Sequence, residues 1–334
     1  MVRLATIGTN FITEYLLGAS KFCKGFTLEA VCSRNEQTAK DFAEKWSAKR
    51  YFTSVEELAA CPDIDAVYIA TPNFTHHGYA MQLLGAGKHV LVEKSGAANR
   101  REYQQMVDLA KEKGLVVLEA IRIAFNPDLE LIRQSLAKLG KIRRAVLTCG
   151  AYSSRYDNFK KGIIENAFKP EMCNGALMDL GVYAVNIMTD LFGAPSKVSA
   201  DVIKLENGLD GVLTATCTYP EMLATIFTSK VADSSGLSEI QGEEGLMIID
   251  SCSTPDSVTI TYNTRRTGEE KIEKLPILAA PFGEDMKYEL QAFIDLIEAG
   301  GAGADRYNDR TLCSLAVMDE IRAKCGMVFP NDAQ

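Results

Sequence analysis

Residues 4–13 read Leu-Ala-Thr-Ile-Gly-Thr-Asn-Phe-Ile-Thr, a short apolar run that ends in Gly8 and leads into a helix-forming pattern. This order predicts a strand, a tight turn and a helix whose N-terminus can receive the pyrophosphate of a dinucleotide. Only Gly8 fits the usual glycine pattern, because Asn10 stands where a second glycine is typical. Asn tolerates a left-handed backbone, which keeps such a turn feasible. Taken alone, the motif fits an ordinary strand-to-helix turn equally well.

The first 120 residues repeat this order of strand and helix. Apolar runs rich in Val, Ile and Leu occupy residues 4–7, 28–32, 66–70, 89–92 and 116–118. Helical patterns lie between them at residues 11–22, 36–46, 54–60, 74–86 and 99–113. Runs without period-two alternation are typical of strands buried on both faces of a parallel sheet. We therefore predict an α/β Rossmann domain, with a doubly wound parallel sheet, over residues 1–121.

The pattern changes after one amphipathic helix at residues 125–138. Segments rich in Val, Thr and Ile follow at residues 142–152, 196–205, 212–219, 223–231, 237–241, 246–250 and 257–262, with helices at 175–191, 284–299 and 308–325. They predict a C-terminal α+β domain with an open, mostly antiparallel sheet. We assign substrate binding and oligomerisation to residues 122–334. Apolar residues expected on both sides of the sheet at 198–203 and 213–217 predict a homodimer or homotetramer.

Composition excludes several classes of protein. The net charge is -8 and no window forms a clustered basic face, so no nucleic-acid partner is expected. No apolar run reaches the length of a membrane span, and the N-terminus lacks a signal-peptide pattern. Nine scattered cysteines without a CxxC pair favour free thiols in the cytoplasm. The three histidines all lie in the first third, which excludes a His-rich metal site across both domains, and we expect no metal.

Polar residues follow the ends of the predicted parallel strands, the edge at which such sheets bind ligands. Ser33-Arg34 stands where an NAD site usually has an acidic residue for the ribose hydroxyl. Because a guanidinium pairs well with a phosphate, these residues favour NADP while leaving NAD open. The expected cofactor-binding residues are Gly8, Thr9, Asn10, Phe11, Ile12, Ser33, Arg34, Thr71, Pro72, Asn73, His76, Glu93 and Lys94.

Four motifs, taken together, resemble a known family. They are Ala70-Thr71-Pro72-Asn73 with His76, Glu93-Lys94, Glu119-Ala120 leading to Asn126-Pro127, and the segment Gly175–Tyr183. The chain resembles the Gfo/Idh/MocA oxidoreductases, the glucose-fructose oxidoreductase and inositol dehydrogenase family. Ser95 departs from the family's Glu-Lys-Pro motif. Tyr183 places the chain with a tyrosine subset similar to dimeric dihydrodiol dehydrogenase. The resemblance implies an NAD(P)-dependent oxidoreductase that acts on a secondary alcohol, or its carbonyl, of a sugar, polyol or cyclic diol.

The resemblance also implies a catalytic group of Lys94, Asp179 and Tyr183. Asp179 and Tyr183 are four residues apart and would share one face of a helix. Tyr183 would act as the acid–base, since a nearby ammonium favours the ionised form of a tyrosine. Lys94 would hydrogen-bond the reacting oxygen, and Asp179 would orient Lys94 or a second substrate hydroxyl. Arg122, Arg155 and Tyr156 are expected to bind substrate.

Two other interpretations stay open. A chain of this fold can bind NADP as a regulator without turnover, although such a protein does not need Lys94, Asp179 and Tyr183 together. An enzyme of this family can also retain its cofactor and recycle it within the site. The residues themselves allow a further interpretation for Asp179 and Tyr183, a buried tyrosine hydroxyl bonded to an aspartate in the core.

Overall fold

The computed structural model describes residues 1–262 and 271–333, and its contacts divide the chain into two compact units. The first unit contains residues 1–122 and 282–312, and the second contains residues 123–281 and 313 onward. A domain boundary at residues 121 and 122 stays a prediction. The contacts add that α10 (Met286–Glu298) groups with the N-terminal residues, and that the division falls within α11 (Asp305–Lys324).

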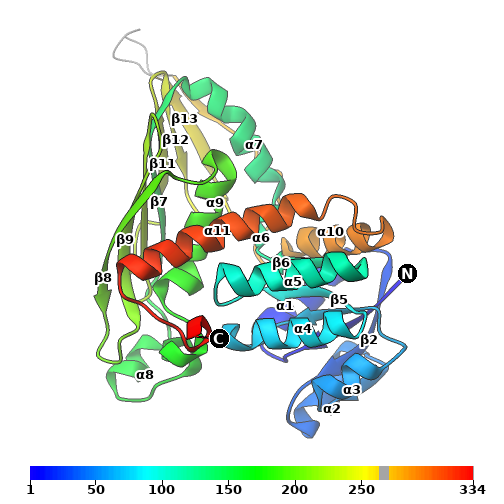
Figure 1. The fold of residues 1–334 in the computed structure, drawn as a ribbon. Coiled ribbons are helices and arrows are strands. Elements are labelled where there is room, and N and C mark those ends of the chain that lie inside the picture. The colour runs from blue at the N-terminus through cyan, green and yellow to red at the C-terminus, as the bar shows by residue number, and fades with distance from the viewer. Residues whose placement is uncertain (263–270, 334) are drawn as a thin grey trace. The chain divides into compact units, whose positions relative to one another are not determined.

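The first unit is built on six parallel strands in the order β3-β2-β1-β4-β5-β6. The strands are β1 (Val2–Ile7), β2 (Phe26–Cys32), β3 (Arg50–Phe52), β4 (Ala66–Ile69), β5 (His89–Glu93) and β6 (Val117–Ala120). The helices are α1 (Phe11–Ser20), α2 (Glu36–Trp46), α3 (Val55–Ala60), α4 (His76–Gly85) and α5 (Arg100–Lys113), with α10 packed against α1 (Figure 1). The predicted doubly wound sheet is confirmed. Sequence reasoning missed β3, because this edge strand is three residues long and has no buried residue.

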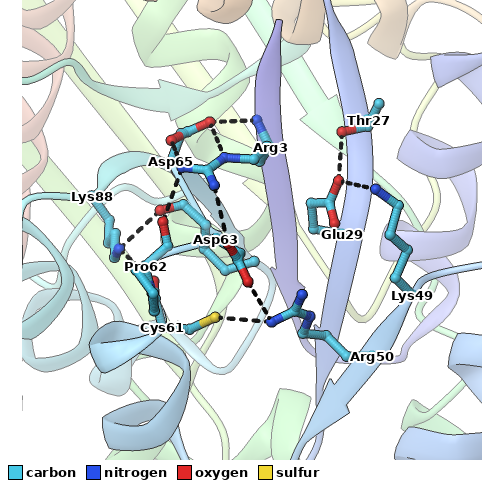
Figure 2. Close-up of polar contacts among 11 residues, drawn as sticks. Arg3, Thr27, Glu29, Lys49, Arg50, Cys61, Pro62, Asp63, Asp65 and Lys88 are labelled. Carbon is cyan, nitrogen blue, oxygen red and sulfur yellow. Dashed lines mark hydrogen bonds and ion pairs between the residues drawn. The ribbon is translucent and has the colours of Figure 1, made fainter.

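An ion-pair network lies where the strands of this sheet begin (Figure 2). The guanidinium of Arg3 donates to both carboxylate oxygens of Asp65, over 2.7 and 2.9 Å. Buried Lys88 donates to the carbonyl oxygens of Cys61 and Ile64. These bonds tie the segments that enter β4 and β5 to one another and to β1. The amino edge is therefore occupied by structural pairs, which leaves the carboxyl edge for ligands.

The second unit contains an eight-stranded sheet in the order β14-β13-β12-β11-β7-β10-β9-β8. Its strands are β7 (Ile142–Gly150), β8 (Lys197–Lys204), β9 (Asp210–Thr218), β10 (Leu223–Ser229), β11 (Ser238–Gly242), β12 (Gly245–Ile249), β13 (Val258–Tyr262) and β14 (Ile272–Lys274). Among the described strands of this second sheet, only the β7–β10 pair is parallel. The predicted open, mostly antiparallel sheet is confirmed, although β14 was not anticipated from its three polar or exposed residues.

Two predicted helices of this unit are divided. The helix expected at 125–138 consists of α6 (Arg122–Phe125), α7 (Pro127–Ser135) and a 3₁₀ turn (Leu136–Leu139). The break occurs because the Asn126 side chain caps α7 and Pro127 opens it. The helix expected at 175–191 begins with a π-helical turn (Leu177–Gly181) and continues as α9 (Val182–Phe192), which lies beside β7 (Figure 1).

One face of the large sheet packs against α9 and the π-helical turn, as shown by the bond from the Thr228 hydroxyl to the carbonyl oxygen of Ala176. The expectation of apolar residues on both faces at 213–217 is wrong. Strand β9 alternates, so that Leu213, Ala215 and Cys217 are buried while Thr214 and Thr216 are not. Among the described residues, no helix is both long and apolar enough to cross a membrane.

Candidate functional site

The turn after β1 depends on Gly8. Its φ is +105°, and a Cβ atom there would lie 2.3 Å from the carbonyl oxygen of Ala70. The backbone of β1's end therefore approaches the end of β4 more closely than any side chain would permit. The Gly8 amide also donates to the carbonyl oxygen of Cys32, over 3.0 Å. This one glycine thus holds together the carboxyl ends of three neighbouring strands.

Asn10 caps the first helix, and its contact with the cofactor stays a prediction. Its backbone is extended, with φ of -85°, so the turn does not use the left-handed conformation that Asn tolerates. The side-chain oxygen instead caps α1 by accepting from the amides of Ile12 and Thr13, and the side-chain nitrogen donates to the carbonyl oxygen of Ala70. A glycine could make none of these bonds. Asn10 therefore replaces the second glycine of the usual pattern with side-chain bonds that fix the turn.

Ser33 and Arg34 follow the end of β2. The Ser33 amide donates to the carbonyl oxygen of Phe52, which joins this position to β3. Arg34 is exposed, and no hydrogen bond or ion pair within residues 1–262 and 271–333 engages its guanidinium. The next residue, Asn35, caps α2 by accepting from the amide of Thr38. The sequence thus places an uncommitted guanidinium beside a helix N-terminus at the ligand edge of the sheet.

His76 links the segments that follow β4 and β5. It is fully buried, and its two ring nitrogens lie 2.8 Å from the carbonyl oxygens of Thr71 and Ser95. Burial lowers the pKa of this histidine, and the nearby Lys94 ammonium lowers it further. A neutral ring donates to one of the two carbonyls. Both nitrogens are engaged within the protein, so the arrangement favours a positioning role. Direct contact of His76 with the cofactor stays a prediction.

The segment after β5, residues 94–99, is fixed by contacts with buried residues. Residues 95–99 are buried, while Lys94 remains partly exposed, and the Lys94–Ser95 peptide bond is cis. The Gly96 amide donates to a carboxylate oxygen of Glu119 over 2.8 Å. A Cβ atom at Gly96 would lie 2.8 Å from the Tyr103 ring, so this close packing requires glycine. Lys94 is therefore the one partly exposed residue of a segment that His76 and Glu119 fix in place.

Two expected ligand contacts have partners inside the first unit. Glu93 is buried and accepts a hydrogen bond from the Tyr68 hydroxyl; burial raises the pKa of this carboxyl. Arg122, expected to bind substrate, lies 3.3 Å from Asp285 and stacks over the Phe282 ring. Only about a tenth of the Arg122 side chain is exposed. These contacts favour a structural role for both residues, and their assigned contacts with ligands stay predictions.

In the second unit, Asp179 lies on the π-helical turn and contacts a lysine that nothing in the sequence singled out. The Lys230 ammonium donates to Asp179 over 3.2 Å and to the carbonyl oxygen of Ala167 over 2.7 Å. The Lys230 side chain is 1% exposed and that of Asp179 is 36% exposed. The charge on Lys230 is thus buried, while its partner carboxylate remains accessible. Tyr183, the second residue of α9, is 7% exposed.

Aromatic rings extend from this ion pair. Lys230 lies 4.8 Å from the centroid of the Phe168 ring, which stacks with Tyr156. The second expected substrate residue, Arg155, forms an ion pair with Glu165 at 3.2 Å. The second unit therefore brings together Asp179, Lys230 and Tyr156, through the ring of Phe168. A lysine after a strand and a phenylalanine in a short 3₁₀ turn carry no sequence signal that would have identified them.

Comparisons with known proteins agree with this organisation. A model of the oxidoreductase family with an NAD-binding Rossmann fold matches residues 2–120, and a model of the GFO/IDH/MocA C-terminal domain matches residues 133–248. The chain therefore belongs to the Gfo/Idh/MocA family, as the motifs indicated, and it is an NAD(P)-dependent oxidoreductase.

Its relatives include dehydrogenases of known activity. The chain is 38% identical over 334 residues to scyllo-inositol 2-dehydrogenase (NADP(+)) of Bacillus subtilis (strain 168), with 99% of each chain covered. It is 29% identical over 316 residues to trans-1,2-dihydrobenzene-1,2-diol dehydrogenase of Homo sapiens, covering 91% of this chain and 90% of that one. A 3-ketoreductase from Actinomadura kijaniata, solved with NADP and TDP-benzene, shares the fold with a TM-score of 0.86 at 20% identity, covering 98% and 99%.

The buried lysine yields the first prediction. Lys230→Met keeps the apolar stem but removes the donors to Asp179 and Ala167. The partly buried Ala167 carbonyl and the Asp179 carboxylate would lose this partner, so we expect the free energy of unfolding to fall by about 1–3 kcal/mol. Denaturant unfolding measures this loss. Lys160→Met is the matched control, because Lys160 is an exposed lysine that pairs with Asp157 at the surface, where such pairs contribute little. Equal losses for the two variants would contradict a structural role for Lys230.

Proposed function

We propose that this chain oxidises a secondary alcohol of a cyclic polyol, sugar or diol, or reduces the corresponding carbonyl, with NADP(H) as its preferred cofactor. The observation that carries the proposal is the carboxyl edge of the first sheet. There Gly8 closes a turn suited to a dinucleotide, and His76 and Glu119 fix the segment that presents Lys94. The names of the inositol and dihydrodiol dehydrogenases similar to this chain support the substrate class.

The residues at this edge fit a dinucleotide. The Gly8 turn leaves no room for a Cβ atom, the capped start of α1 follows it, and Arg34 has no competing carboxylate among the described residues. The helix N-terminus favours the pyrophosphate, and the Arg34 guanidinium favours a 2′-phosphate. When bound, the nicotinamide gives or takes a hydride at the substrate carbon.

The chain's own residues would move the proton of the oxygen on that carbon and stabilise its negative charge. Tyr183 takes up or returns the hydroxyl proton, and the Lys94 ammonium hydrogen-bonds the same oxygen and stabilises its developing negative charge. Asp179 accepts a hydrogen bond from a second substrate hydroxyl. Lys230 orients that carboxylate from its buried side, so one oxygen of Asp179 is engaged by the protein while the carboxylate stays accessible. Tyr156 offers a ring surface against which a sugar or polyol ring can pack.

Cofactor choice gives the second prediction. Arg34→Ala should weaken binding of NADP(H) about ten- to hundredfold, because a charged hydrogen bond to phosphate contributes roughly 1.5–3 kcal/mol. Binding of NAD(H), which lacks the phosphate, should change little. Titration of both cofactors by intrinsic fluorescence measures the two dissociation constants. An unmodified protein that binds NAD(H) as tightly as NADP(H) would argue against the assigned role of Arg34.

The third prediction concerns the acid–base group. Tyr183→Phe keeps the ring but removes the hydroxyl, and Lys94→Met keeps the stem but removes the charge. Each should lower turnover by about 10²–10⁴-fold with much less effect on NADP(H) affinity. Because both groups act on one oxygen, the double variant should lose little more than the worse single one. Near-normal turnover by Tyr183→Phe, with cofactor binding intact, would leave Tyr183 as a core residue.

Regulation without turnover is the competing function. Such a protein would bind NADP but would need neither the accessible Asp179 carboxylate nor the fixed Lys94 segment. These two features favour an enzyme. Retention of nucleotide through gel filtration would further identify an enzyme that keeps its cofactor between turnovers. We also propose a cytoplasmic location, because all nine cysteines are free thiols in the structure.

Self-association gives the fourth prediction. The face of the large sheet opposite α9 mixes threonines with apolar residues; Thr225 of β10, for example, pairs in register with Thr216 and Val146. Leu223 at the start of β10 and Ile203 of β8 are exposed. Covering such a face with a second copy would remove apolar surface from water. Light scattering at micromolar concentration should give an even multiple of 36.6 kDa. A mass of one chain would contradict the proposed homodimer or homotetramer.

A further inference from the structure

Four of the buried carboxyl side chains in the first unit interact with one another near the Lys94 segment. They are Glu93 of β5, Glu119 of β6, Asp285 just before α10 and Glu289 of α10, and we call them the acid cluster. Each of the other three interacts electrostatically with Glu289. The cations near the cluster are Arg122, which interacts with Glu93 and Glu289, and Lys94, which interacts with Glu93 and Glu119.

Hydrogen bonds distinguish Glu289 from the other three carboxyls. Glu93 accepts from the Tyr68 hydroxyl. Glu119 accepts from the Gly96 amide and the Thr311 hydroxyl, each over 2.8 Å. Asp285 accepts from the Gly283 amide and from Arg122. Glu289 is fully buried, and neither of its oxygens has a hydrogen-bond partner among the described residues.

The number of charges points to the same residue. Among the described residues the four carboxyls of the cluster face two cations, so full ionisation would leave uncompensated negative charge in a buried region. Bonds from N–H and O–H donors stabilise the ionised forms of Glu93, Glu119 and Asp285. Glu289 has no such donor and faces its neighbours' negative charge. It is therefore the carboxyl for which a neutral, protonated state is most favourable.

We propose that Glu289 is held as a neutral carboxylic acid and acts as a positioning residue for Lys94, by limiting the negative charge beneath that lysine. The part that concerns Lys94 rests on the proposed function. When Glu289 releases its proton to solvent at alkaline pH, the extra negative charge in the acid cluster draws the Lys94 ammonium inward, away from the reacting oxygen. The lysine then serves the reacting oxygen less well. Burial, and next the charge of Glu93, raise the pKa of Glu289 well above its usual range.

Other groups near α10 do not supply a counter-charge. Helix α1 packs against α10, but its Glu14 pairs with Lys45 and its Tyr15 packs edge-on against Phe282. From β6, the charged side chain that faces Glu289 is Glu119. Within the described part of the chain, no group of three or more His, Cys, Asp or Glu side chains is arranged to hold a metal ion. We therefore do not interpret the acid cluster as a cation site.

Infrared spectroscopy of the full chain without added cofactor tests the proton directly. The unmodified protein at neutral pH should show the C=O stretching band of a protonated carboxyl, and Glu289→Gln should lose it. Glu298→Gln, which removes an exposed carboxylate from the same helix, should keep the band. A spectrum without this band, or a band unchanged in Glu289→Gln, would overturn the proposal. If Glu289→Gln does not fold, Glu289→Met provides the same comparison.

Stability and turnover against pH test the consequences. A carboxyl whose folded pKa is raised contributes stability that is present below its unfolded pKa of about 4.3 and is lost as pH rises through its folded pKa. Glutamine has no proton to lose, so Glu289→Gln should melt a few degrees above the unmodified protein at alkaline pH, with the difference growing as pH rises. A difference in melting temperature between the two proteins that is the same at all pH values would overturn the proposal that Glu289 holds a proton.

The alkaline limb of kcat/KM tests the effect on Lys94. In Glu289→Gln this limb should move upward by about one pH unit, since the extra charge that draws Lys94 inward no longer forms in the acid cluster. Identical limbs in the two proteins would overturn the positioning role. A protonated-carboxyl band in a protein that turns over no substrate would instead mean that the proposed function is wrong while the proton-holding site stands.

Discussion

The close contact of the buried His76 ring with two carbonyl oxygens is the constraint on which the first unit's ligand edge depends. Parallel strands end at one edge of a sheet, but the segments that leave them are free to diverge. A buried ring between the carbonyl oxygens of Thr71 and Ser95 removes that freedom, because moving either segment would leave a polar group buried without a partner. Gly8 adds the same effect on the other side of β4, where its missing side chain lets two backbones touch. Lys94 is presented by a segment that these contacts hold still.

The two edges of the parallel sheet have different roles. The amino edge contributes to stability, and the carboxyl edge carries the groups that can bind ligands. At the amino edge, Arg3 and Lys88 satisfy backbone carbonyls and carboxylates with bonds that leave little capacity for a ligand. At the carboxyl edge, Arg34 is left uncommitted among the described residues, and Lys94 stays partly exposed. Behind that edge, buried carboxyls of the acid cluster compensate the positive charge of Lys94. Charge that a ligand or substrate can use therefore lies at one edge, and its compensation is buried.

The sequence predicted most of the fold because periodicity depends on local chemistry. Continuous apolar runs such as that of β4 are typical of strands with both faces covered, and Asn35 and Asn99 cap the helices that they precede. The misses have local causes as well. The strand β3 is too short and too polar to produce a run, and Asn126 interrupts an amphipathic pattern that reads as one helix.

The candidate site was less predictable, because the residues that support it are distant in sequence from the groups they contact. Lys230 carries no signal in its own neighbourhood, yet it reaches Asp179 from 51 residues away. Glu289 looks like any polar residue of an amphipathic helix until the structure shows it facing Glu93 and Glu119. Asn10 looked like a defect in a glycine motif and proved to be a helix cap that also fixes the end of β4.

Under the proposed function, the carboxyl edge of the first sheet serves oxidation of a cyclic secondary alcohol. Purified protein can be mixed with NADP⁺ and a panel of inositols, sugars and cyclic diols, with linear secondary alcohols as controls, and read by the absorbance of the reduced nicotinamide. We expect formation of NADPH with at least one cyclic polyol or diol, and much slower formation with the linear alcohols. Tight binding of NADP⁺ without turnover of any substrate, in either direction, would contradict it.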